Sequence, residues 1–353
     1  MKTSELKEVC SVFTGVIKND KIRPITDLVE IYAKDGIAHI GSTDNRTTII
    51  ATLEETNDIE NAVVSLSSLN KLIKLTTKGT VTMRRKNNYV EFVGNGKYKM
   101  PIQLDEMGNE ISLPLSIPEM GNFVTYNVAD WKKLQERNSI GLFTGDDHNE
   151  FKLYHVEDNF VVTSDSVIFA KTNNMTLPNG DLQSFIVDQL SCFNNRDMKL
   201  SNANDGYRIS IDNFELYMVN KLYYKFPVDL VTPFLVNPSQ NDMFCGSFVV
   251  RAKYIKDAVR RQNIFKNPFS VPSIVFSIVD SKIYIKNKED SVIEELEEVH
   301  DINFNISLDV TVATSIFLEV IKNMDENVCV HIGERAICLE DAQGFYIIAA
   351  MEV

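Results

Sequence analysis

Cys329 and His331 are the first residues in this sequence whose types and spacing could bind a metal. They lie two apart on a predicted strand, so both side chains point to the same face, and Cys338 follows nearby. Thiolate and imidazole groups are common zinc ligands, but a zinc site would need a fourth ligand and a tighter spacing. Buried cysteines on alternating strands are ordinary core residues. The sequence therefore predicts neither a metal site nor a cofactor.

The other residue types used in catalysis are scattered along the chain. The segment 94–97 (GNGK) lacks the spacing and the following helix of a phosphate-binding loop, and predicts a hairpin turn. Asp146, Asp147 and Glu150 could hold a divalent ion, as a nuclease would require, although acids in a polar loop are usually only solvated. The histidines show no paired spacing: His39, His148, His155, His300 and His331. A non-catalytic protein is favoured, with a metal-dependent nucleic-acid-processing enzyme that uses the scattered acidic residues as the alternative.

Ordered rows of cations are a more informative pattern. The segment 251–266 carries six basic residues and one acid, in a chain whose formal net charge is −13. At helical spacing, its apolar stripe contains Ala252, Ile255, Ala258 and Val259. Its other side carries Lys253, Lys256 and Arg260. For one helix alone, a solvated charged face is the simpler interpretation.

Two more predicted helices have the same character, which favours a shared basic surface. In the helix at 65–77, the inward residues are Leu66, Leu69 and Ile73, and the outward residues are Lys71, Lys74 and Lys78. In the helix at 128–137, Trp131 and Leu134 face inward, and the outward residues are Lys132, Lys133 and Arg137. Acidic residues gather in a strand-like segment instead, at Glu289-Asp290, Glu294-Glu295 and Glu297-Glu298. This partition suits a protein that surrounds a polyanion.

Length and composition bound the class of protein. A chain of 353 residues is too long for one ordinary core, and 44% hydrophobic with 24% charged residues is typical of a globular protein. Five scattered cysteines predict a reducing cytoplasm without disulfides. No apolar run approaches the about 20 residues of a membrane helix. The N-terminal segment 4–17 predicts an amphipathic helix with Ser4 as N-cap, and not a signal peptide.

Helix and strand patterns recur in the same order three times. The first third continues with strands at 28–39 and 47–53, the helix at 65–77 and hairpin strands within 81–100. The second third predicts the helix at 128–137, strands at 151–154 and 160–163, a helix near 187–194, and strands at 207–211 and 214–219. The last third predicts the basic helix, strands at 274–279, 282–285 and 302–306, a helix at 308–323, and closing strands within 344–353.

The spacing of equivalent turns identifies an internal repeat. Hairpin turns are predicted at Asp35, Asp158 and Asp280, which are separated by 123 and 122 residues. A period of this length over nearly the whole chain predicts an α+β fold of three tandem domains. Helix and strand patterns lapse at 114–121 and 237–242, so we expect domains at 1–120, 121–240 and 241–353.

Four short segments, in this order and spacing, carry a resemblance to a known family. Residues 97–100 (KYKM) match the strand that closes the family's first domain, and 162–170 (VTSDSVIFA) resembles its Thr-Asp-Gly-His-Arg-Leu-Ala run. Residues 225–227 (KFP) are similar to its Phe-Pro-Asp-Tyr segment, and 346–353 (YIIAAMEV) to its Tyr-Val-Val-Met-Pro-Met-Arg-Leu ending. The family is the β sliding clamp, the β subunit of bacterial DNA polymerase III, and a divergent phage-encoded copy fits the resemblance as well.

The resemblance implies a function without catalysis. Members of this family form ring-shaped homodimers of DNA-clamp domains, each with two helices packed on antiparallel sheets. The ring encircles duplex DNA without sequence specificity and tethers the replicative polymerase as a processivity factor in DNA replication. Polymerase and clamp loader bind the ring through short peptide motifs, in the cytoplasm of the bacterial or infected cell, and no membrane is involved.

Three sets of site residues follow from the resemblance. The partner-peptide pocket would contain Ser164, Phe169, Pro227, Val231, Ile347, Ala349 and Met351. The dimer interface would pair Ile264 and Phe265 with Tyr98 and Met100. The DNA-facing residues would be Lys71, Lys74, Lys132, Lys133, Arg137, Lys253, Lys256 and Arg260.

The sequence departs from the family at the pocket. The family's Gly-His-Arg is Ser166-Val167-Ile168 here, and its Met-Pro-Met-Arg-Leu ending is AAMEV at 349–353. Both changes affect the pocket more than the ring. We therefore expect the pocket of this chain to differ from that of the family in its affinity for the usual clamp-binding peptides.

Overall fold

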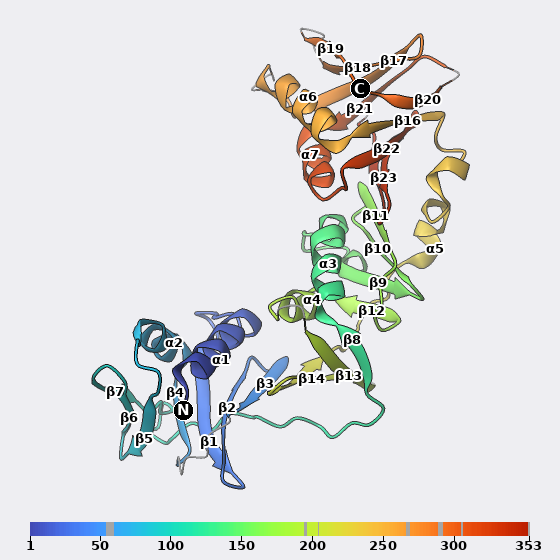
Figure 1. Ribbon diagram of the computed structural model, residues 1–353. Helices are drawn as coiled ribbons and strands as arrows, with labels where there is room; N and C mark the ends of the chain where they lie inside the picture. Colours follow the sequence, from blue (N-terminus) through green and yellow to red (C-terminus); the bar gives the residue numbers. More distant parts are fainter. Residues whose placement is uncertain are drawn as a thin grey trace. The chain divides into compact units, whose positions relative to one another are not determined.

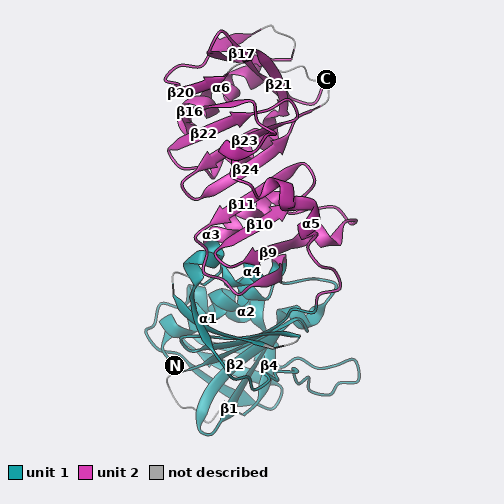
Figure 2. Ribbon diagram, turned by 90° about the vertical axis from the view of Figure 1, so that its right-hand side faces the viewer, with its two compact units in different colours: residues 1–132, 185–221 teal, residues 133–184, 222–353 magenta. Residues whose placement is uncertain are grey.

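The computed structural model describes residues 1–53, 60–193, 196–203, 205–265, 269–288, 292–304 and 306–351. Five residues that the sequence analysis singled out lie outside these ranges: Lys266, Glu289, Asp290, Glu352 and Val353. The chain divides into two compact units (Figure 2). Unit 1 contains Met1–Lys132 and Phe185–Lys221, and unit 2 contains Lys133–Ser184 and Leu222–Val353.

Unit 1 is built on two antiparallel sheets (Figure 1). The larger has eight strands in the order β4-β1-β2-β3-β15-β14-β13-β8, and the smaller has the order β5-β6-β7. The strands of the first third are β1 Leu28–Lys34, β2 Ile37–Thr43, β3 Thr47–Thr52, β4 Ala62–Ser65, β5 Thr82–Lys86, β6 Tyr89–Val93 and β7 Lys97–Pro101. The remaining strands are β8 Val124–Asn127, β13 Asp197–Ala203, β14 Gly206–Ile211 and β15 Phe214–Val219.

Amphipathic helices cover unit 1 as the apolar periodicity predicts. Helix α1 (Thr3–Val16) lies beside α2 (Leu66–Leu75), and α4 spans Ser184–Leu190. The predicted inward residues of α2 are buried, and α1 buries an apolar face with Leu6, Val9, Cys10 and Phe13, which confirms both helices. Ser65 caps α2 by accepting a hydrogen bond from the Ser68 N–H. The prediction of Ser4 as N-cap of α1 is wrong, because the helix begins one residue earlier and Lys2 occupies that position.

Unit 2 also contains two antiparallel sheets. One has nine strands in the order β12-β9-β10-β11-β24-β23-β22-β16-β20, and the other has the order β19-β18-β17-β21. The strands are β9 Leu153–Glu157, β10 Phe160–Ser164, β11 Ile168–Asn173, β12 Gly180–Gln183, β16 Gly246–Arg251, β17 Ser273–Val279 and β18 Lys282–Asn287. They continue with β19 Ile293–Glu295, β20 His300–Phe304, β21 Leu308–Ala313, β22 Asn327–Ile332, β23 Ala336–Asp341 and β24 Gly344–Ala349.

Helices α6 (Ala252–Ile264) and α7 (Thr314–Lys322) pack together in unit 2, and their inner faces join a large apolar core. Helix α3 (Val128–Asn138) begins in unit 1 and ends in unit 2, and a short helix α5 covers Val228–Val231. The prediction of one helix over 308–323 is wrong in its first part. The segment 308–313 (LDVTVA) is rich in β-branched residues and pairs with β17 along its whole length.

Three hairpins repeat through the chain at the predicted turns. Asp35, Asp158 and Asp280 have φ angles of 53°, 47° and 49°, the left-handed conformation that short hairpin turns require. Each hairpin belongs to a group of four strands: β4-β1-β2-β3, β12-β9-β10-β11, and β21-β17-β18-β19. In every group the first strand as written here, β4, β12 or β21, leads directly into a helix. The predicted threefold repeat is therefore present in the topology.

Neighbouring repeats are joined by strand pairing. Strand β3 of the first repeat pairs with β15 of the second, and β11 of the second pairs with β24 of the third. Each compact unit therefore contains parts of two repeats, because the paired strands of neighbouring repeats belong to one continuous sheet. Among the described residues, no helix is long and apolar enough to cross a membrane.

Candidate functional site

An apolar pocket of about 410 Å³ opens on the surface of unit 2. Its walls come from the turn between β10 and β11, from α5 and the segment after it, and from β23 and β24. The lining residues are Phe151, Ser164, Ser166, Val167, Ile168, Phe169, Leu230, Val231, Phe234, Met243, Arg335, Ala336, Ile347 and Ala349. This volume lies within the usual range for small-ligand and peptide-anchor pockets. Arg335 contributes the one charged side chain of this lining.

A polar turn holds one wall of the pocket in place. The Asp165 carboxylate accepts hydrogen bonds from the backbone N–H groups of Val167 and Ile168, at 2.9 and 2.6 Å. Ser166, between Asp165 and Val167, has a φ of 77°. In the first repeat, Asp44 bonds the turn between β2 and β3 in the same way. This type of turn presents Val167 at the surface while Phe169 returns to the core.

Five of the seven residues predicted for the partner-peptide pocket surround this one cavity: Ser164, Phe169, Val231, Ile347 and Ala349. Pro227 lies just before α5, outside the lining. Met351 also lies outside the lining, and its backbone N–H bonds the Thr311 carbonyl on β21. The resemblance did not assign Phe151, Phe234 and Met243 to the pocket. Phe151 begins the strand predicted at 151–154, and the other two lie in the segment between α5 and β16, which has no periodic pattern.

The predicted DNA-facing cations differ in their exposure. Lys71 and Lys74 are exposed on α2, and Lys253 and Arg260 on α6, whereas Lys256 is half-exposed. On α3, Lys132 is exposed and Lys133 half-exposed. These six lysines and Arg260 project away from the apolar faces of their helices, as their spacing predicts.

Arg137 is the exception, and the prediction that it points outward is wrong. Its side chain is 5% exposed, and it forms a two-point ion pair with Asp341 on β23, with N–O distances of 2.9 and 3.0 Å. It also donates to the Asn323 carbonyl at 2.9 Å and lies over the ring of Tyr346. The Tyr346 hydroxyl donates back to the Arg137 carbonyl, and burial raises the pKa of Tyr346 to about 12. Arg137 thus anchors the last turn of α3 within unit 2.

Two of the edge strands differ from their equivalents in the other repeats. They are β7 in unit 1 and β19 in unit 2, which lie at the edges of their sheets. By position in the repeat, β7 corresponds to β15 and β24, and β19 corresponds to β3 and β11, all of which are paired. Apolar residues predicted for the dimer interface lie at or near these edges. Tyr98 on β7 is 42% exposed and Ile264 and Phe265 are 74% and 56% exposed, whereas Met100 is buried within unit 1.

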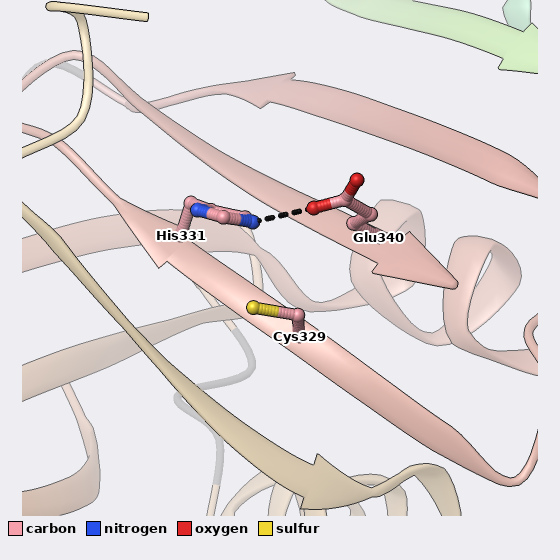
Figure 3. Close-up of side chains that lie close together, drawn as sticks. All are labelled: Cys329, His331 and Glu340. Atoms are coloured by element: carbon pink, nitrogen blue, oxygen red, sulfur yellow. Dashed lines mark hydrogen bonds and ion pairs between the residues drawn. The ribbon is translucent and has the colours of Figure 1, made fainter. Parts of the chain in front are cut away.

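The acids considered for a nuclease site do not converge. Glu150 bonds His148, and among the described residues Asp146, Asp147 and Glu150 form no group of closely spaced metal-binding atoms. Cys329, His331 and Glu340 do form such a group (Figure 3). Burial acts to lower the pKa of His331, but hydrogen bonds with Cys329 and Glu340 outweigh it and raise the pKa to about 9.

Comparison with solved structures identifies the fold. The chain is similar to the DNA polymerase III beta subunit of Thermotoga maritima, with a TM-score of 0.79, 16% identity, and 100% of this chain and 98% of that chain covered. The comparison with the DNA polymerase sliding clamp of Pseudomonas aeruginosa gives a TM-score of 0.81 at 14% identity, with 100% of this chain and 99% of that chain covered. The comparison with the DNA polymerase III beta chain of Streptococcus pneumoniae gives a TM-score of 0.83 at 12% identity, with 100% of this chain and 98% of that chain covered. No protein-family model and no curated protein matches the sequence.

Proposed function

We propose that this chain is a DNA sliding clamp: a non-catalytic ring that encircles duplex DNA and tethers a replicative polymerase. The observation that carries the proposal is the full-length match in fold to polymerase III beta subunits, with TM-scores of 0.79 to 0.83 and no large uncovered segment in either chain. The match includes the complete threefold repeat, whereas an active site needs only one copy of its scaffold. The scattered acids support no competing nuclease site among the described residues.

The edge strands β7 and β19 support the closure of a ring. Because β3 and β11 pair with the next repeat, β19 at the end of the series would pair with β7 of a second copy in the same way. Two copies joined head to tail then close a ring of six repeats with two equivalent joints. Glu294 and Glu295 on β19 already bond Arg261 and Lys282, so backbone pairing and apolar contact would hold the joint more than charge.

Contact with DNA would go through the helices. Lysines and arginines on α2, α3 and α6 offer contacts to phosphates and none to base edges, as a ring that moves along any sequence requires. The contributing residues are Lys71, Lys74, Lys132, Lys133, Lys253, Lys256 and Arg260, without the buried Arg137. The net charge of −13 disfavours binding of DNA elsewhere on the surface.

The apolar pocket would bind short peptides of the polymerase and the clamp loader. Phe169, Val231 and Ile347 form a buried apolar floor, which suits one or two aliphatic or aromatic anchors. The free cysteines and the role in replication are consistent with a cytoplasmic location.

Retention on circular DNA tests the proposal. The protein is loaded onto a nicked circular plasmid with clamp loader and ATP, and the complex is isolated by gel filtration at moderate salt. We expect the protein to stay with the circle and to be lost once a restriction enzyme linearises it, because topology and not affinity retains it. Equal retention on circular and linear DNA would contradict the clamp, and cleavage of either DNA with added Mg²⁺ would favour the enzyme alternative.

A further inference from the structure

Three potential metal ligands converge on one face of the nine-stranded sheet in unit 2. Cys329 and His331 lie two apart on β22, and Glu340 on β23 is the direct cross-strand partner of Cys329. Their ligand atoms all lie within 4.8 Å of one another. Figure 3 shows the sulfur and the carboxylate on the same side of the imidazole ring, next to its Nε2 atom.

The surroundings hold these side chains in place. Strand β22 lies inside the sheet between β16 and β23, so its backbone is fixed by hydrogen bonds on both sides. The imidazole of His331 is 4% exposed, bonds Glu340 through Nε2 at 2.8 Å, and has the ring of Phe244 at 5.9 Å from its centroid. Cys329 and Glu340 are only half-buried, so an ion could reach the group from solvent.

This geometry differs from that of a nucleophilic cysteine. In a Cys–His–acid triad the thiol and the carboxylate contact opposite nitrogens of the imidazole, so that a proton can be relayed. Here both groups lie beside Nε2, an arrangement that directs three donor atoms to one point. Convergence on one point is the requirement for binding an ion.

We propose that Cys329, His331 and Glu340 bind a zinc ion. Sulfur, imidazole nitrogen and carboxylate oxygen are the ligand types that Zn²⁺ combines. Zinc bonds of about 2.0–2.3 Å at tetrahedral angles place ligand atoms about 3.3–3.8 Å apart. The observed group, from 2.8 Å between His331 and Glu340 to a limit of 4.8 Å, reaches this spacing by small side-chain rotations.

The fourth coordination position would be left to water or to an external ligand. Cys338 is the cross-strand partner of His331, but its thiol is fully buried in the apolar cluster beneath the peptide pocket. The proposed zinc ligands include none of the residues assigned to DNA, dimer or pocket.

Titration of the metal-free protein with ZnCl₂ tests the site. Calorimetry on the full-length chain, after treatment with a chelator, is expected to give one ion per chain with release of protons, because zinc binds thiolate and neutral imidazole. Co²⁺ in place of Zn²⁺ is expected to give the near-ultraviolet charge-transfer band of a cobalt–thiolate bond. The variants Cys329→Ser and Glu340→Gln should each weaken Zn²⁺ binding at least tenfold, and Cys329→Ser should abolish the band.

The matched control is Cys192→Ser, which removes an exposed cysteine of unit 1 and should leave Zn²⁺ binding unchanged. Far-ultraviolet circular dichroism and thermal melting establish that each variant is folded. Absence of stoichiometric binding by the parent protein would overturn the proposal. It would equally be overturned if Cys329→Ser bound Zn²⁺ as tightly as the parent, or if the cobalt–thiolate band depended on Cys192.

Discussion

Replacing Arg137 with alanine should destabilise unit 2 and leave DNA contacts intact. The substitution removes both N–O contacts of the ion pair with Asp341, whose side chain is fully buried, together with the bond to the Asn323 carbonyl. Breaking a buried pair by deleting one partner costs about 3–5 kcal/mol, because the remaining charge is buried without compensation. Asp341 keeps hydrogen bonds from the backbone N–H groups of Asp325, Gln343 and Gly344, so we expect a value near the lower limit, about 3 kcal/mol.

Urea unfolding followed by circular dichroism measures this loss, together with thermal melting. In a unit of this size, each kcal/mol of lost stability lowers the melting temperature by about 2–4 °C, so the melting temperature should fall by about 6–12 °C. Arg137→Lys keeps the charge but not the two-point geometry, and should lie between the parent and Arg137→Ala. Lys133→Ala on the same helix is the matched control and should change stability by less than about 0.5 kcal/mol.

The competing interpretation of Arg137 as a DNA-facing residue makes the opposite prediction. If it were correct, Arg137→Ala would melt like the parent protein and would lower retention on circular DNA. A stability loss below about 1 kcal/mol would therefore refute the assignment of Arg137 to a buried anchor.

Three further predictions concern assembly, partners and DNA. Phe265→Glu should place a charge in the joint between copies, so that the solution mass by light scattering falls from about twice 40.1 kDa to the monomer value. An unchanged dimer would argue against the β7–β19 joint. Leu230→Asp changes an exposed wall of the pocket. It should weaken binding of an apolar clamp-binding peptide at least tenfold in fluorescence polarisation without altering the melting temperature. Undiminished binding would remove the pocket from the proposal. Changing Lys253, Lys256 and Arg260 together to alanine should reduce loading on circular DNA, while the helix keeps its apolar face. Loading at the parent level would exclude α6 from the DNA surface.

Elements set by local sequence could be predicted from the chain alone. The helix at 65–77 follows from its apolar spacing, and the hairpins at Asp35, Asp158 and Asp280 follow from their turn residues. The repeat of 123 and 122 residues could be read from the spacing of those turns. These signals are short-range, since a cap, a turn or a helical face depends on residues within a few positions.

Tertiary structure decided the features that depend on distant partners. The segment 308–313 follows its pairing with β17 instead of the helical pattern that continues in α7. Arg137 turns inward because Asp341, 204 positions later, offers it a buried carboxylate. His331 gains Glu340 as a neighbour only through the register of β22 and β23, although Cys329-x-His331 was visible in the sequence. Strand register and ion-pair partners are non-local, because they are selected by the packing of whole sheets and not by the residues that flank them.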